Sequence, residues 1–91
     1  MKVRITHGPD RDALEKKGVF SWPIWTKEES KFPWFYDEQE TFYVLEGDVT
    51  LTPEDGEPVC FGKGDLVVCP AGMACTWEIH SSVRKHYRFD E

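Results

Sequence analysis

Two stretches of the chain decide the fold: Glu40-Thr-Phe-Tyr-Val-Leu-Glu-Gly47 and Gly64-Asp-Leu-Val-Val-Cys-Pro70-Ala-Gly72-Met-Ala-Cys75. Each contains a short run of β-branched, aromatic or other apolar residues bounded by glycine or proline, which predicts a strand that ends in a turn. The first stretch places a glutamate seven positions before a glycine, and the second has the spacing Gly-x5-Pro-x-Gly. The 17 positions from Gly47 to Gly64 leave room for one hairpin between the two stretches.

The same pattern continues on both sides of these stretches. From Val19 onward, turn residues interrupt apolar or alternating runs every 8–12 positions, as in β-sandwiches and barrels. The predicted strands are Val19–Trp25, Trp34–Tyr36, Thr41–Leu45, Val49–Thr52, Val59–Phe61, Leu66–Cys69, Cys75–Ile79 and Val83–Phe89. Asp55-Gly56 predicts the clearest hairpin, because both residues tolerate the positive φ of a tight turn. Connections this short cannot make parallel crossovers, so we expect an all-β, antiparallel, closed domain.

Pro9–Lys17 predicts one short helix before the strands. Pro9 suits the first turn, acidic residues precede the two lysines, and Gly18 ends the segment, in the order that helices prefer. A helix of about nine residues is not stable alone. We therefore expect it to pack against the β-domain.

Length and composition limit the class of protein. The 91 residues suit a single domain over residues 1–91. A net charge of −6 disfavours a nucleic-acid partner, and no stretch approaches the roughly 20 apolar residues that cross a membrane. The N-terminus lacks an apolar signal-peptide region. The three cysteines match neither a disulfide framework nor a C-x-x-C site, so we expect a cytoplasmic protein with buried thiols.

Glu40-x6-Gly47 and Gly64-x5-Pro70-x-Gly72 resemble parts of the two cupin motifs. Three further stretches are similar to a small single-domain family of largely unassigned function in the RmlC-like cupin superfamily: Ser21-Trp-Pro-Ile-Trp25, Trp34-Phe-Tyr36 and Val83-Arg-Lys-His-Tyr87. That family is related to the cupins of ureidoglycine aminohydrolase and of ethanolamine utilisation. The resemblance covers roughly residues 3–89. It implies a double-stranded β-helix, or jelly roll, with its site in the barrel mouth, and a homodimer.

The resemblance also implies a metal site, but this sequence lacks most of the usual metal ligands. Metal-binding cupins use two histidines of an H-x-H pair, a glutamate and a third histidine. The three histidine positions hold Trp34, Tyr36 and Cys75, or Pro33, Phe35 and Cys75 under an alternative spacing. Only Glu40 remains, so we predict no metal cofactor. The alternative is zinc bound by Glu40, Cys75 and His86, because zinc accepts all three ligand types.

Strand parity predicts which side chains share a pocket, because successive residues point to opposite faces of a sheet. On the last strand either Lys85 and Tyr87 or the set Arg84, His86 and Arg88 points inward. Two buried arginines would have to be desolvated and paired, so we expect Lys85 and Tyr87 inside and the other set in solvent. The predicted ligand-binding residues are Trp34, Tyr36, Glu40, Phe42, Cys75, Trp77, Lys85 and Tyr87.

Such a pocket is compatible with three functions. The first is a metal-independent small-molecule-binding cupin, in which aromatic faces hold an apolar or sugar-like body while Glu40 and Lys85 fix a polar or amine-bearing end. The second is an enzyme that acts on a nitrogenous or sugar-like metabolite, with or without a metal, whose candidate catalytic residues are Glu40, Cys75 and Lys85. The third is a structural or regulatory dimer with a filled barrel. A buried Glu40 needs a partner, and Lys85 is the candidate.

Overall fold

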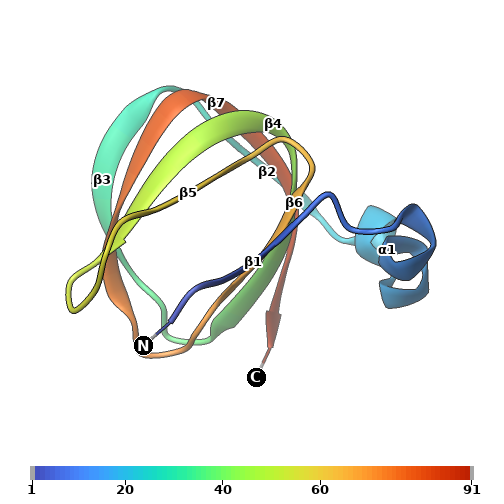
Figure 1. Ribbon diagram of the computed structural model, residues 1–91, viewed down its shortest axis with the longest axis horizontal. Coiled ribbons are helices and arrows are strands. Elements are labelled where there is room, and N and C mark those ends of the chain that lie inside the picture. The colour runs from blue at the N-terminus through green and yellow to red at the C-terminus, as the bar shows by residue number, and fades with distance from the viewer. Residues whose placement is uncertain (1, 91) are drawn as a thin grey trace.

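The computed structural model describes residues 2–90, most of which lie in strands that wrap around one interior (Figure 1). The elements in chain order are β1 Arg4–His7, α1 Arg11–Lys17, the 3₁₀ helix η1 Val19–Ser21, β2 Ile24–Lys27, β3 Ser30–Phe35, β4 Gln39–Pro53, β5 Val59–Gly62, β6 Asp65–Cys69 and β7 Ala74–Asp90. The predicted all-β class with one short N-terminal α-helix is confirmed. Within these residues, no helix has the length and apolar character that a membrane crossing requires.

Two long strands, β4 and β7, form the frame of the barrel. They pair antiparallel from Gln39 opposite Asp90 to Pro53 opposite Cys75. Each long strand also has two shorter partners: β4 pairs first with β6 and then with β5, and β7 pairs first with β3 and then with β2. β1 pairs with β6 at one edge. The described residues thus form one seven-stranded antiparallel sheet that curls into the predicted double-stranded β-helix.

Irregularities around Gly47 bend the two long strands. Between the pairs Val44–Lys85 and Val49–Ile79, β7 contributes one residue more than β4, which is the defining feature of a β-bulge. The buried side chains of β4 therefore change from even to odd positions: Glu40, Phe42 and Val44 before the bulge, and Val49, Leu51 and Pro53 after it. Because of this switch, both halves of β4 face the same interior.

Several predicted element boundaries change. Gly47-Asp48 is not a turn between two strands, because the φ of 129° at Gly47 fits a bulge inside the continuous strand β4. The two predicted C-terminal strands also merge into β7. The predicted strand Val19–Trp25 begins instead with η1, and β1 was not predicted. The hairpin at Asp55-Gly56 and the helix stop at Gly18, with φ of 76°, are confirmed.

One apolar cluster occupies much of the interior. Its buried members are Val3, Tyr36, Phe42, Val44, Val49, Leu51, Phe61, Val67, Cys69, Met73, Cys75, Trp77, Ile79 and Val83. Tightly packed aromatic rings run through it: the Phe42 and Phe61 ring centroids lie 5.3 Å apart, and each ring lies within 6 Å of Trp77. This packing closes one part of the barrel interior.

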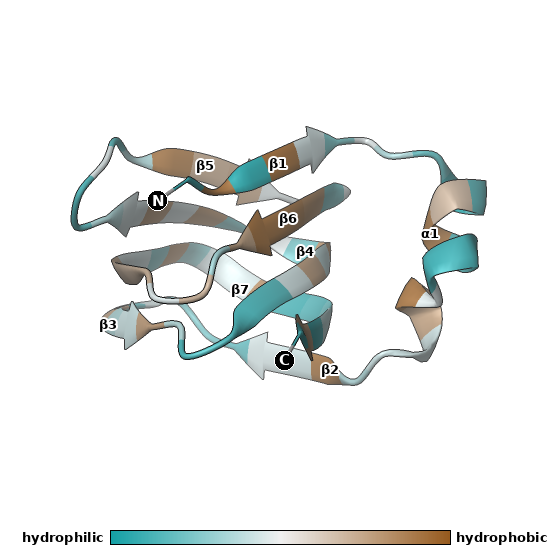
Figure 2. Ribbon diagram, turned by 90° about the horizontal axis from the view of Figure 1, so that it is seen from below, coloured by the Kyte–Doolittle hydropathy of each residue, from teal (hydrophilic) through white to brown (hydrophobic). Residues whose placement is uncertain are grey.

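The N-terminal helical segment lies outside the barrel (Figure 2). Phe20 packs edge-on against His86 at 5.8 Å and against Tyr43 at 5.9 Å, and Nδ1 of His86 is 2.9 Å from the backbone oxygen of Trp22. His86 is therefore buried. The prediction that the whole set Arg84, His86 and Arg88 faces solvent is wrong for His86, because η1 and the residues that follow it cover the outer face of β7.

We predict that Gly47→Ala lowers the free energy of unfolding by about 3 kcal/mol. A Cβ atom there would lie 2.8 Å from Val83 Cγ2 and 3.0 Å from Val83 Cα. The control is Gly64→Ala, because Gly64 also has a positive φ, 87°, but no atom lies within 4 Å of the added Cβ. The control should cost about 1 kcal/mol. Urea unfolding measures the free energy of unfolding of both variants. An equal decrease in the two would contradict a bulge that is fixed by contact with Val83.

Candidate functional site

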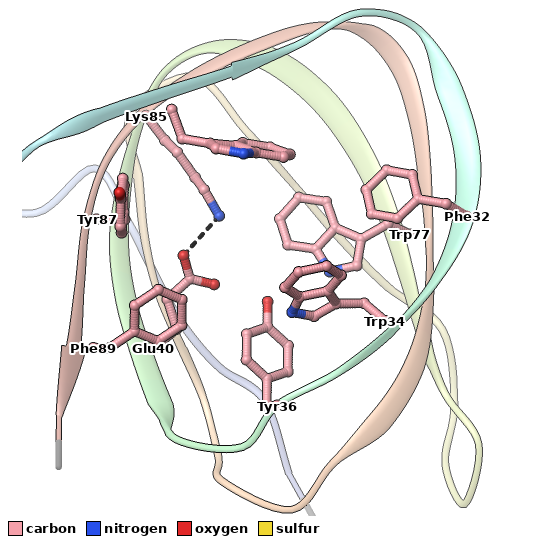
Figure 3. Close-up of a pocket in the computed structure, with 9 residues that line it drawn as sticks. Phe32, Trp34, Tyr36, Glu40, Trp77, Lys85, Tyr87 and Phe89 are labelled. Carbon is pink, nitrogen blue, oxygen red and sulfur yellow. Dashed lines mark hydrogen bonds and ion pairs between the residues drawn. The ribbon is translucent and has the colours of Figure 1, made fainter.

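A mostly aromatic pocket with a volume of about 190 Å³ opens into the barrel (Figure 3). It is built by side chains of β2, β3, β4 and β7 and by Tyr36, the residue directly after β3. The lining residues are Trp25, Phe32, Trp34, Tyr36, Glu40, Trp77, Lys85, Tyr87 and Phe89. Seven of these nine are aromatic, and the other two form an ion pair.

Glu40 and Lys85 form a buried ion pair on one wall of the pocket. Lys85 Nζ donates a hydrogen bond of 2.9 Å to Glu40 Oε2, and the side chains of Lys85 and Glu40 are 4% and 5% exposed. Burial lowers the pKa of Lys85, and the neighbouring Glu40 opposes this shift. Each charge therefore offsets part of the other's desolvation cost.

The amino group of Lys85 also lies over aromatic rings. Its Nζ is 3.9 Å from the ring centroid of Phe42, 4.6 Å from that of Trp77 and 4.8 Å from that of Trp25. Such contacts stabilise a desolvated cation through the negative faces of the rings. Strand pairing produces this arrangement, because Trp25 of β2 lies opposite Lys85 of β7.

Two buried polar atoms that line the pocket lack a well-placed hydrogen-bond partner. Among the described residues, no hydrogen bond reaches Trp77 Nε1, and Tyr36 Oη makes none of good geometry, although it lies close enough to Cys69 and Glu40 to interact with both. Burial is the main cause that raises the pKa of Tyr36, and the nearby Cys69 and Glu40 add to the shift. The phenol is therefore neutral. A neutral phenol and an indole N–H are both hydrogen-bond donors, and leaving them unpaired destabilises the protein.

The thiols near the barrel interior are not activated. Burial raises the pKa of Cys69 to about 12 and that of Cys75 to about 11, and the charge of Glu40 adds to both shifts. Cys75 Sγ also donates a long hydrogen bond of 3.6 Å to the backbone oxygen of Trp34. A nucleophilic thiolate needs the opposite environment. Cys60 is exposed on β5, so the prediction that all three thiols are buried is wrong for this residue.

The structure brings most of the predicted ligand-binding residues together. Lys85 and Tyr87 point into the barrel and line the pocket with Trp34, Tyr36, Glu40 and Trp77. Two predicted residues lie elsewhere. Phe42 is a core residue beneath the amino group of Lys85. Cys75 lies opposite Trp34 in the β3–β7 ladder and is buried, but it does not line the cavity.

Sequence reasoning missed three pocket residues, Trp25, Phe32 and Phe89. Phe89 shares strand parity with Lys85 and Tyr87, and Phe32 shares it with Trp34, so parity could have identified both. No local pattern marks Trp25. Its place depends on the long-range pairing of β2 with β7, which puts its ring 6.0 Å from that of Trp77.

The residues around Glu40 do not fit the metal site that the cupin resemblance implies. Within residues 2–90, no three histidine, cysteine, aspartate or glutamate side chains gather in a way that could hold a metal ion. The zinc set of Glu40, Cys75 and His86 is not assembled, because His86 points to the outer face of β7 and contacts Trp22. The amino group of Lys85 already pairs with Oε2 of Glu40 at 2.9 Å.

A family model and solved structures relate this chain to known proteins. A family model of the EutQ-like cupin domain matches residues 14–87. A DUF861 family protein from Thermotoga maritima has a similar structure, with a TM-score of 0.94 and 46% identity, over 98% of this chain and 100% of that protein. No curated protein matches the sequence.

Two more distant structures share part of the fold. A putative ethanolamine utilization protein Q from Salmonella typhimurium has a TM-score of 0.65 and 29% identity, over 72% of this chain and 53% of that protein. The EutQ protein of Clostridium difficile has a TM-score of 0.66 and 24% identity, over 72% of this chain and 52% of that protein. The relation to ureidoglycine aminohydrolase stays a prediction.

We predict that Glu40 and Lys85 are energetically coupled. Glu40→Gln and Lys85→Met should each lower the free energy of unfolding by about 1–4 kcal/mol. The double variant should lower it by less than the sum of the two, because it leaves no buried charge without a partner. Urea unfolding of the four proteins measures the coupling. Arg11 and Glu15, an exposed pair at 3.2 Å, provide the control, with an expected coupling of about 0.3–0.5 kcal/mol. Strict additivity for Glu40 and Lys85 would contradict the pairing.

A second prediction concerns the thiols. At pH 8, iodoacetamide should label Cys60 rapidly, whereas Cys69 and Cys75 should react only after unfolding, because they are buried and their pKa values are about 12 and about 11. Mass spectrometry after digestion locates the labelled residues. Rapid labelling of Cys75 in the folded protein would show that its thiol is accessible and ionised.

The same pKa shifts predict a pH dependence of stability. A raised folded-state pKa keeps the proton on the native thiol above pH 8.5, where the unfolded chain begins to lose it. The contribution of Cys75 to the free energy of unfolding is therefore fully present below about pH 8.5, and it is lost as the pH rises toward about 11. The difference in unfolding free energy between the natural protein and Cys75→Ala should shrink over this range. A difference that is constant with pH would contradict the shift.

Proposed function

Because this chain belongs to the EutQ-like cupin domain family, we propose that the mouth of its barrel binds one small molecule without a metal ion. The proposed site is the aromatic pocket around Glu40 and Lys85. The bound molecule contacts the aromatic faces with its apolar part and hydrogen-bonds to the few polar groups. This division of roles is common in small-molecule sites.

The two buried donors carry the proposal. Tyr36 Oη and Trp77 Nε1 are buried and both residues line the pocket, yet among the described residues Trp77 Nε1 has no partner and Tyr36 Oη has only Cys69 and Glu40 nearby, without a hydrogen bond of good geometry. A barrel that served only as a packed core would be expected to bury apolar groups, not polar donors without good partners, at these positions. A polar atom of a bound molecule would satisfy both donors. The filled-barrel alternative provides no such partner.

The ion pair supports a role that needs no metal. The amino group of Lys85 already supplies the positive charge beside Glu40, at 2.9 Å. The neutral thiols of Cys69 and Cys75 support binding rather than nucleophilic catalysis. The homodimer and the cytoplasmic location stay predictions.

We predict that protein purified without added metal contains well under one equivalent of manganese, iron, nickel or zinc. Native mass spectrometry of the protein from its own host should instead detect a retained small molecule that is released on denaturation. Stoichiometric metal that disappears in Glu40→Gln would contradict the proposal.

A matched pair of variants localises the binding. Trp34 lines the pocket and is 48% exposed, whereas its neighbour Phe35 is 54% exposed and does not line it. Trp34→Ala should reduce the fraction of protein that retains the small molecule several-fold, because it removes a large part of one aromatic wall. Phe35→Ala should leave that fraction unchanged. Equal retention in the two variants would place the molecule outside the pocket.

A further inference from the structure

The pocket has room for one ring. An apolar cavity of about 150 Å³ in another protein binds benzene, and the cavity here has a volume of about 190 Å³. The rings of Phe32 and Trp77, which both line the cavity, are stacked nearly parallel, with an interplanar angle of 14°. Trp34 and Phe89, 48% and 42% exposed, lie at the entrance. These walls suit a planar ring with one short substituent.

The two buried donors of the pocket favour an acceptor on the ligand. The indole N–H of Trp77 can only donate, and the neutral phenol of Tyr36 can donate as well. In Figure 3 the Tyr36 hydroxyl points toward the middle of the pocket. A carbonyl oxygen has two lone pairs and can accept from both donors.

The ligand can also donate a hydrogen bond to Glu40. A carboxylate has about four acceptor sites, and Lys85 Nζ donates to Oε2. The other carboxylate oxygen points into the pocket on the side that faces Tyr36 (Figure 3). A group that accepts at Tyr36 and donates at Glu40 must carry both functions on neighbouring atoms, as a carboxamide or a lactam does.

The charges argue against an ionic ligand. Lys85 Nζ occupies the faces of Trp25, Phe42 and Trp77. These ring faces would otherwise stabilise an ammonium group of a ligand most strongly. An anion would share a mostly aromatic pocket with the carboxylate of Glu40 and would gain little from a lysine that is already paired. The ion pair is neutral as a whole, so a neutral ligand leaves it undisturbed.

From these observations we infer that the pocket takes a neutral, planar, single-ring molecule with an amide-type group, whose carbonyl accepts from Tyr36 and Trp77 and whose N–H donates to Glu40. This inference rests on the proposed function, because it assumes that the pocket binds a small molecule. The sequence analysis expected a ligand with a polar or amine-bearing end near Glu40 and Lys85. The pocket geometry restricts that end to an uncharged group.

Four probes of similar shape test the inference: benzamide, benzoate, benzylammonium and ethylbenzene. Dissociation constants come from NMR titrations of the intact protein. Benzamide should bind about 10-fold or more tightly than either charged probe, because transfer of a charge into this pocket is unfavourable. It should also bind more tightly than ethylbenzene, which pairs with neither donor. Tighter binding of benzoate, benzylammonium or ethylbenzene would overturn the inference and leave the proposed function intact.

Tyr36→Phe separates a hydrogen bond from mere packing. The variant should weaken benzamide binding about 2- to 10-fold, the range for one hydrogen bond, and leave ethylbenzene binding unchanged. Without ligand, it should be about as stable as the natural protein, because the hydroxyl that it removes makes no hydrogen bond of good geometry. Equal weakening of both probes would overturn the role of the hydroxyl. No binding of any probe, together with no retained molecule in native mass spectrometry, would overturn the proposed function as well.

Discussion

The structure of the site depends on one constraint, a carboxylate that must be buried inside an aromatic barrel. Glu40 lies near the start of β4 with its side chain 5% exposed, and such a charge is tolerated only beside an opposite charge or a hydrogen-bond donor. In metal-binding cupins, as the resemblance implies, histidines and a metal ion surround this glutamate. Here a lysine of the last strand neutralises it, and aromatic rings surround the lysine in turn. The pocket therefore has a charged pair but little net charge.

This pair depends on the geometry of the two long strands. β4 and β7 remain paired through the irregular register around Gly47, across which the inward-facing side chains of β4 change from even to odd positions. Because of that change, both Glu40 and Leu51 face the interior, while β7 keeps Lys85 and Trp77 inside. His86 points the other way and is covered by η1. The fold thus places the imidazole of His86 on the opposite face of β7 from the ion pair.

The sequence predicted the class of fold and much of the pocket, for physical reasons. Period-two alternation and turn residues depend on local sterics, so the strands, the hairpin at Asp55-Gly56 and the inward face of Lys85 could be predicted. The misassignments have non-local causes. Gly47 could equally mark a turn or a bulge, because positive φ suits both. The burial of His86 and the place of Trp25 depend on which distant segments pack on β7, and neither has a local signal.

A crystal structure of the protein from its own host, with anomalous diffraction data, tests the central claim most directly. The account predicts that Lys85 Nζ remains within hydrogen-bond distance of Glu40 and that a ligand atom lies within reach of both Tyr36 Oη and Trp77 Nε1. No anomalous peak should appear beside Glu40. A metal peak bonded to Glu40, with the side chain of Lys85 displaced from it, would contradict the claim.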